Sequence, residues 1–216
     1  MKLGRRELLW IPLSLPAASL LDRRTIAKAP TRALVPEQPI ERIAFGSCAM
    51  RWMEQPIWQA VAASRPDLFL FLGDAIYGDY DGEKVFTPTE EILLRDWGEL
   101  AAQPGFEFLR EQVPVMATWG NHDYGSHDGG AEIAHEAMSK KIVLDFFEEP
   151  EDSARRRCDG VYDARIFGAE GRRVQVILFD NGWNRGALVP DTRSKEERKA
   201  LEISGSMGHT PTKTPR

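Results

Sequence analysis

Two continuous apolar runs, at residues 68–72 and 113–119, dominate the pattern of hydrophobic and polar positions along this chain. Runs of this length without alternation are typical of strands buried on both faces, as in parallel sheets. A shorter run at 42–45 predicts a third strand, which ends in Gly46-Ser47-Cys48. A helical stripe at 54–64, between the first two strands, completes a predicted β-α-β unit.

Further elements are predicted from spacing and turn residues. Thr87, followed by Glu90, predicts a capping box at the start of a helix that ends near Ala101. Two later helices are predicted at 105–112 and about 131–147. The runs 161–167 and 173–179 are separated by a short segment with two glycines, which predicts a β-hairpin.

Polar motifs follow the two long apolar runs directly. Gly73-Asp74-Ala75-Ile76-Tyr77 follows the first run, and Gly120-Asn121-His122-Asp123 follows the second. Carboxyl ends of neighbouring parallel strands share one edge of the sheet, where α/β folds gather their ligand sites. An Asp, an Asn and a His at one edge can hold hard divalent cations and supply a proton donor. The pattern therefore indicates metal-assisted hydrolysis of a phosphate ester.

The length and net charge of the chain exclude few classes of function. The chain has 216 residues, which favours one domain, and 42% hydrophobic residues, which is ample for a packed core. Its net charge of −5 argues against a basic surface for nucleic acid.

The amino terminus has the composition of an export signal. Arg5 and Arg6 precede an apolar segment at 8–21 that contains two prolines and is too short for a stable membrane span. This order predicts a signal peptide read by the twin-arginine export machinery, and hence a periplasmic or extracellular protein. The alternative is a frayed amphipathic tail with a chance arginine pair. Cleavage could follow Ala18 or Ala29.

Composition divides the chain into a signal peptide, a proline-containing linker, one structured domain and a polar tail. The predicted boundaries are 1–29, 30–41, 42–185 and 186–216. His209 lies in the tail and is expected to be solvent-exposed. His127 is expected in a loop and His135 on a helix surface. In an exported chain Cys48 and Cys158 could form a disulfide, but their different settings favour separate roles.

Each residue of the two motifs has a chemical and a purely structural interpretation. Asp74 could bridge two cations or merely cap a turn, and Asn121 could offer its amide oxygen to a cation or form a turn with Gly120. His122 could act as a general acid and Asp123 could orient its ring. Taken together, the motifs favour the chemical interpretation.

Tyr77 and Cys48 extend the possible ligand set. A phenolate and a thiolate suit ferric iron, which would favour the loss of both protons. The structural alternatives are a half-buried core aromatic for Tyr77 and a small buried hydrophobic residue for Cys48.

These motifs resemble the PhoD-like alkaline phosphatases of the calcineurin-like metallophosphoesterase superfamily. The resemblance rests on Phe45-Gly46-Ser47-Cys48, Leu72-Gly73-Asp74-Ala75-Ile76-Tyr77-Gly78-Asp79, Thr118-Trp119-Gly120-Asn121-His122-Asp123-Tyr124-Gly125, Asp128-Gly129-Gly130-Ala131-Glu132, Gly160-Val161-Tyr162-Asp163 and 174–180. It implies an α/β fold, a metallophosphoesterase-type β-sandwich flanked by helices.

The resemblance also implies cofactors and roles for individual residues. Fe3+ would be held by Cys48, Asp74 and Tyr77, and Ca2+ would be shared by Asp74 and Asn121, with Zn2+ or Mn2+ as alternatives. His122 would be catalytic and Arg185 would bind the phosphate of the substrate. The implied reaction is the hydrolysis of phosphate mono- or diesters by a metal-activated hydroxide.

The chain also departs from the family pattern. Relatives usually have Asp-Asp-His where Gly120-Asn121-His122 stands, and Asp-Thr-Arg where Asp180-Asn181-Gly182 stands. Relatives continue past this point with a later His-bearing motif, so we expect an incomplete C-terminal part and a first sheet that lacks its partner sheet. We therefore also expect exposed apolar surface, weak metal retention and little phosphatase activity. The rival interpretations are a truncated or degenerate metal-binding homologue without catalytic activity and a fragment without a stable fold.

Overall fold

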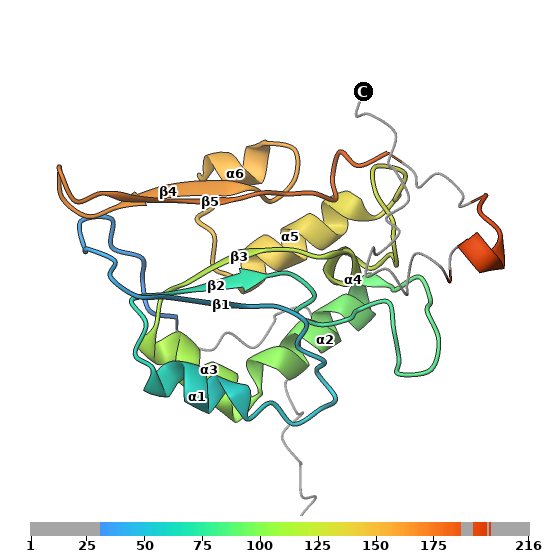
Figure 1. Ribbon diagram of the computed structural model, residues 1–216, viewed down its shortest axis with the longest axis horizontal. Helices are drawn as coiled ribbons and strands as arrows, with labels where there is room; N and C mark the ends of the chain where they lie inside the picture. The colour runs from blue at the N-terminus through green and yellow to red at the C-terminus, as the bar shows by residue number, and fades with distance from the viewer. Residues whose placement is uncertain (1–30, 187–191, 198, 200–216) are drawn as a thin grey trace, which may run out of the picture.

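A three-stranded parallel sheet forms the centre of the protein (Figure 1). The computed structural model describes residues 31–186, 192–197 and 199. Strands β1 (Ile43–Gly46), β2 (Leu68–Leu72) and β3 (Val115–Thr118) lie in the order β1-β2-β3, with Phe69 paired to Ala44 and to Val115. The prediction of parallel strands at the three apolar runs is confirmed.

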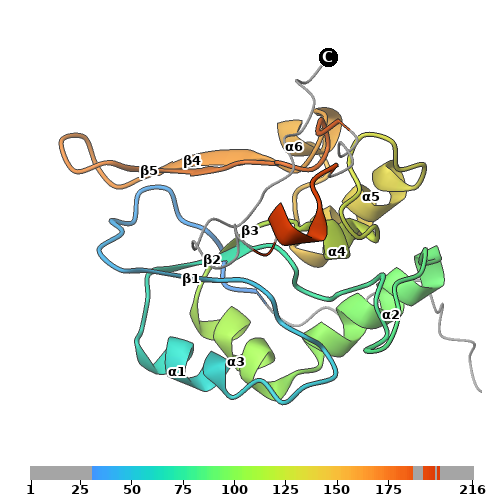
Figure 2. The same cartoon turned by 45° about the vertical axis from the view of Figure 1, so that its right-hand side comes forward.

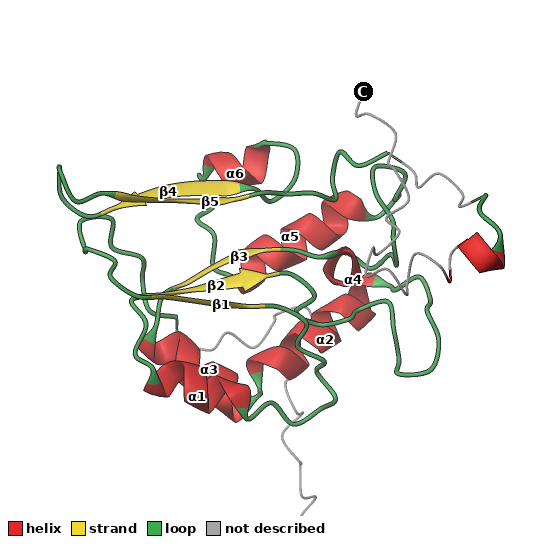
Figure 3. Ribbon diagram, viewed as in Figure 1, coloured by secondary structure: helices red, strands yellow, loops and turns green. Residues whose placement is uncertain are grey.

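Helices α1 (Ile57–Ala63), α2 (Glu90–Ala101) and α3 (Pro104–Gln112) form a layer on one face of this sheet, as the colouring in Figure 3 shows. Aromatic side chains join the two layers. The ring of Trp58 on α1 lies 5.7 Å from that of Phe69 and 4.9 Å from that of Phe106 on α3, measured between centroids. This core fixes the strands whose ends carry the polar motifs.

Two predicted helix starts are wrong. The N-cap of α2 is Thr89, whose hydroxyl accepts the Ile92 N–H at 3.3 Å, so the capping box predicted at Thr87 is misplaced. Helix α5 (Glu136–Phe146) begins later than predicted because the residues before it form turns. The Ala131 N–H there donates to the Arg185 carbonyl at 2.9 Å, a contact across 54 residues that local patterns do not encode.

Two one-turn helices were not predicted. Helix α4 (Asn121–Tyr124) begins directly after β3, and α6 (Ala154–Arg157) lies in the arginine-rich segment. Both are too short to show a helical period in the sequence. Because α4 contains Asn121 and His122, its position decides the geometry of the site.

The second sheet consists of strands β4 (Asp163–Phe167) and β5 (Val174–Leu178), which pair antiparallel as the predicted hairpin. Figure 2 shows it lying over the first sheet, opposite α1 and α3. Its inward residues Phe167, Val176 and Leu178 pack with Leu68 and Met116 in a second hydrophobic core. Two facing sheets flanked by helices confirm the predicted α/β sandwich.

The second sheet leaves apolar surface uncovered, as expected from the sequence. Phe45 on β1 is 71% exposed, and Ile177 and Phe179 on the hairpin are 51% and 77% exposed. The expectation that the first sheet would have no partner sheet needs correction, since the hairpin packs against β2 and β3 through the second core.

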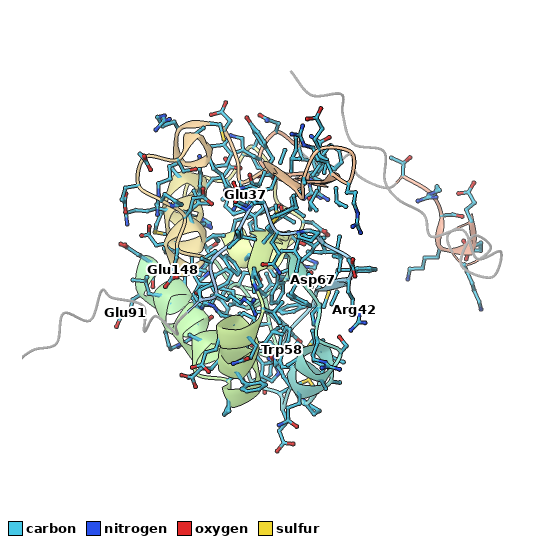
Figure 4. All side chains as sticks on the ribbon, turned by 90° about the vertical axis from the view of Figure 1, so that its left-hand side faces the viewer. Glu37, Arg42, Trp58, Asp67, Glu91 and Glu148 are labelled. Atoms are coloured by element: carbon cyan, nitrogen blue, oxygen red, sulfur yellow. The ribbon has the colours of Figure 1, made fainter. Side chains whose placement is uncertain are left out.

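The segment before β1 lies along the domain. Leu34 and Ile40 pack against the second core, and the Asp67 carboxylate accepts the N–H groups of Glu41 and Arg42 at 2.9 and 2.8 Å (Figure 4 labels Arg42 and Asp67). The predicted signal peptide and His209 lie outside the described residues. Within the described residues, no helix is long and apolar enough to cross a membrane.

Candidate metal and phosphoester site

The polar motifs meet at the carboxyl edge of the first sheet. Cys48 follows β1, Asp74 follows β2 and Asn121 follows β3. The Cys48 Sγ lies 3.8 Å from Asp74 Oδ2, and the Cys48 and Ala49 N–H groups donate to the Gly73 and Asp74 carbonyls at 3.2 and 2.9 Å. We refer to Cys48, Asp74, Tyr77 and Asn121 as the edge cluster.

Three residues of the edge cluster have a left-handed backbone. The φ angles are 63° at Cys48, 54° at Asp74 and 54° at Tyr77. Side chains with a Cβ seldom adopt this region, and such strain persists only where the surroundings enforce it, typically at functional sites. A concentration of this strain at the predicted ligands supports a functional role for the edge.

Two glycines allow the ends of β2 and β3 to approach closely. A Cβ at Gly73 would lie 2.7 Å from the Trp119 carbonyl carbon, and a Cβ at Gly120 would lie 2.7 Å from the Asp74 nitrogen. Real Cβ atoms do not approach backbone this closely, so both positions require glycine. This close approach sets Asp74 against the start of α4, next to Asn121.

Asp123 does not orient the His122 ring, contrary to the sequence-based interpretation. Its Oδ1 accepts the Ala75 and Ile76 N–H groups at 2.6 and 3.1 Å, and its Oδ2 accepts the Gly120 N–H at 2.8 Å. Burial, followed by the nearby charge of Asp74, raises the pKa of Asp123 to about 7. Asp123 therefore ties the loop after β2 to the loop after β3.

Asp79 takes the role that the sequence had suggested for Asp123. The His122 Nδ1 lies 2.6 Å from Asp79 Oδ1, and the Asp79 side chain is fully buried. A proton on Nδ1 would donate to this carboxylate oxygen and leave Nε2 for a reacting group. The sequence holds two signals for Asp79. Gly78-Asp79 repeats the Gly-Asp pair that begins the motif, and Asp79 ends one of the stretches on which the family resemblance rests.

The His122 ring is fixed on a second side by Tyr77. The two rings stack with their centroids 4.4 Å apart and their planes at 30°. Burial lowers the pKa of His122, but the hydrogen bond and charge of Asp79 outweigh burial and raise it overall. A protonated imidazole with one nitrogen anchored has the properties of a general acid.

Tyr77 is only 8% exposed. Its pKa is raised, first by burial and then by the neighbouring Cys48 and Asp74. A cation would reverse this effect, because it stabilises the phenolate and the thiolate together.

The donor set fits a metal ion. Asp74 Oδ1 is buried and has no hydrogen-bond partner, which is costly for a carboxylate unless a cation or ordered water completes it. Among the described residues, no group of three His, Cys, Asp or Glu side chains is placed to hold a metal. A metal site at this edge therefore depends on the phenol of Tyr77 and the amide of Asn121.

Arg185 makes hydrogen bonds with the segment at residues 129–131. Its guanidinium donates to the Gly129 carbonyl, and its carbonyl accepts the Ala131 N–H at 2.9 Å. Its Nε is buried without a partner. In the described part of the chain, no hydrogen bond or ion pair joins Arg185 to Asp74.

The remaining Cys and His residues take varied positions. Both cysteines are free, and the Cys158 Sγ lies 3.3 Å from the Arg155 carbonyl. The His127 side chain is 53% exposed in a loop, with its ring centroid 5.3 Å from that of His122. His135, which we expected on a helix surface, is half-buried, with its Nε2 3.2 Å from the Gly125 carbonyl.

Comparison with known proteins bears on the family and the fold of this chain. The profile of the calcineurin-like phosphoesterase family matches residues 51–211. A solved structure described as the structure of PhoD is similar with a TM-score of 0.55 and 15% identity, over 78% of this chain and 37% of that chain. At this identity the likeness shows a shared fold, and the chain spans little more than a third of that protein. No curated protein matches the chain.

Proposed function

Because the chain belongs to the calcineurin-like phosphoesterase family, we propose that it is a metal-dependent phosphatase that hydrolyses phosphate mono- or diesters. The observation that carries the proposal is the edge cluster, in which Asp74 has one buried oxygen without a partner, Oδ1, and its other oxygen, Oδ2, lies 3.8 Å from the Cys48 Sγ. His122 stacks on Tyr77. Cation ligands and an anchored acid thus share one edge of the sheet.

The family implies bound metal ions, and the donors suggest which ones. Cys48, Asp74 and Tyr77 would hold Fe3+, and Asp74 and Asn121 would share Ca2+, with Zn2+ or Mn2+ as alternatives. When bound, such cations lower the pKa of water so that hydroxide is available, and they neutralise charge on the phosphate oxygens.

The residues around the cluster would position the substrate and move one proton. His122 would donate its Nε2 proton to the departing oxygen while Asp79 holds Nδ1 at 2.6 Å. Tyr77 would limit rotation of the imidazole through the ring stack. Arg185 could contact the phosphate only after releasing the Gly129 carbonyl.

The test of this function is metal-dependent turnover of the purified chain. We expect hydrolysis of an aryl phosphate ester that stops after dialysis against a chelator and returns when Fe3+ with Ca2+, or Zn2+ or Mn2+, is added back. Turnover that is unaffected by chelation would refute the metal-dependent mechanism.

A second candidate is a metal-binding homologue without catalysis. The observation that favours it is that Arg185, the residue expected to bind the phosphate, donates instead to the Gly129 carbonyl. Metal bound at stoichiometric amounts without turnover of mono- or diesters would establish this alternative.

A ferric Tyr77 ligand predicts a coloured protein. We expect an iron-loaded sample to show a visible phenolate-to-iron charge-transfer band that disappears in Tyr77→Phe. Tyr80→Phe is the matched control, because the Tyr80 hydroxyl instead donates to the Gly82 carbonyl at 2.8 Å. A colourless protein that binds only zinc would contradict the ferric assignment.

We also propose export to the periplasm or the cell exterior through the twin-arginine machinery, on the basis of Arg5 and Arg6. Replacing both with Lys should leave the precursor in the cytoplasm, as measured by cell fractionation. The control replaces Arg23 and Arg24, a second pair that follows the apolar segment, and should be exported normally. Normal export of the first variant would exclude this route.

A further inference from the structure

Arg51 lies under the loop that carries Asp74, Tyr77 and Asp79. The residue follows Cys48 closely in sequence and is only 8% exposed. Its guanidinium donates from Nη1 to the Ile76 carbonyl at 2.8 Å and to the Tyr77 carbonyl at 3.0 Å. One buried cation thus bonds the carbonyls of the two peptides that flank Tyr77, whose backbone is left-handed.

Asp96 on α2 anchors this guanidinium from below. Arg51 Nε lies 3.0 Å from Asp96 Oδ1 and 3.0 Å from Glu99 Oε2. The Asp96 side chain is fully buried, whereas Glu99 is 48% exposed. A buried ion pair with further hydrogen bonds has little orientational freedom, so it holds the guanidinium at a fixed position.

The opposite side of the same loop is held by a charge of the other sign. Asp123 accepts the Ala75 and Ile76 N–H groups, and Arg51 donates to the Ile76 and Tyr77 carbonyls. The loop therefore lies between the Asp123 carboxylate, which accepts hydrogen bonds from its N–H groups, and the Arg51 guanidinium, which donates hydrogen bonds to its carbonyls. These two sets of contacts can hold the loop in a strained backbone conformation. The loop would relax to another conformation if either set of contacts were lost.

We propose that Arg51, anchored by Asp96, is a positioning residue that holds the 74–80 loop in the conformation that brings Tyr77 and Asp79 to His122. The catalytic consequence rests on the proposed phosphoesterase function, whereas the effect on the loop does not. Arg51 is not itself placed to touch substrate, because its donors are directed at loop carbonyls and at the carboxylates of α2.

Arg95 offers a matched control for Arg51. It contacts the same Asp96 oxygen at 2.7 Å, but its side chain is 55% exposed. Replacing Arg95 with Lys alters the electrostatics of Asp96 without removing a donor to the loop. Replacing Arg51 with Lys keeps the buried positive charge but removes the planar fork that reaches Asp96 and two carbonyls together.

The first measurement is kinetic. We expect Arg51→Lys to lower kcat by ~10–100-fold with KM little changed, as for other residues that act through a ligand, and to weaken metal retention. Arg95→Lys should match the unsubstituted chain. Wild-type kcat and metal content in a folded Arg51→Lys protein would overturn the proposal.

The second measurement does not depend on catalysis or metal. In the metal-free chain, hydrogen exchange at Gly78, whose N–H donates to the His122 carbonyl at 2.9 Å, should accelerate in Arg51→Lys. Exchange at Phe69, whose N–H donates to Pro114 in the sheet, should stay slow. Equal acceleration at both amides would show a merely global loss of stability and refute a positioning role.

If Arg51→Lys fails to fold, Asp96→Asn applies the same test, because it removes the negative charge that anchors the guanidinium while Arg51 itself is retained. Local acceleration at Gly78 supports the proposal, and an unchanged rate refutes it. If no variant hydrolyses any ester, the proposed function fails, and the exchange data alone decide the role of Arg51.

Discussion

Replacing Asp74 should abolish both metal binding and hydrolysis. Asp74 is the one residue assigned to both cations, and its Oδ1 is already buried without a hydrogen-bond partner. Without this carboxylate, Cys48, Tyr77 and Asn121 remain as ligands, but no negatively charged group bridges the two proposed cations. We therefore expect Asp74→Ala to reduce turnover to the level of the chelated protein, beyond the ~10–100-fold loss typical of residues one step removed from a metal.

Backbone strain must be separated from ligation in this test. Asp74 has a φ of 54°, where alanine is disfavoured by roughly 1–2 kcal/mol, so Asp74→Ala also strains the turn. Asn tolerates this conformation, and Asp74→Asn removes the charge while keeping the shape. Metal content by elemental analysis and turnover should both fall in Asp74→Asn. Retention of full metal and activity there would show that Asp74 is a turn residue and not a bridge.

A surface carboxylate of the same segment provides the control. Asp81 accepts the Glu83 and Lys84 N–H groups at 3.0 and 2.9 Å, and these bonds lower its pKa. It therefore stabilises a local turn and is not a ligand candidate. Asp81→Ala should leave metal content and turnover unchanged.

Patterns within single segments predicted the sheet and its active edge. The run at 68–72 is apolar at every position, and its strand is buried from Leu68 to Phe71 apart from partial exposure at Leu70, as a central parallel strand requires. Parallel pairing of β1, β2 and β3 then places Cys48, Asp74 and Asn121 at one edge without further information. Burial and strand direction are both readable from local sequence.

Partnerships between distant residues were not predictable in the same way. His122 pairs with Asp79 across 43 positions, whereas the sequence suggested its neighbour Asp123. In a one-turn helix the adjacent side chain points elsewhere, and Asp123 instead caps backbone N–H groups of another loop. The role of Arg51 likewise depends on α2 packing beneath the loop. Such roles follow from tertiary packing, which no local period encodes.

Removing His122 should slow hydrolysis while leaving the metals in place. Its ring is anchored by Asp79 and stacked on Tyr77. His122 is not one of the proposed metal ligands, so its removal leaves their donor atoms in place. We expect His122→Ala to lower kcat by ~10²–10⁴-fold, the usual contribution of a general acid, with metal content unchanged. Metal loss equal to that of Asp74→Ala would show that His122 is a ligand and contradict the role proposed here.

The pairing of His122 with Asp79 sharpens this test. Asp79→Asn keeps a side chain of the same shape but presents no charge to Nδ1, so it should lower kcat by less than His122→Ala does. Adding Asp79→Asn to His122→Ala should then cause little further loss, because two residues that act as one unit are not additive. His127→Ala is the control, since that side chain is 53% exposed with its ring 5.3 Å away. Full additivity of the two substitutions would mean that Asp79 supports the site through the loop rather than through the imidazole.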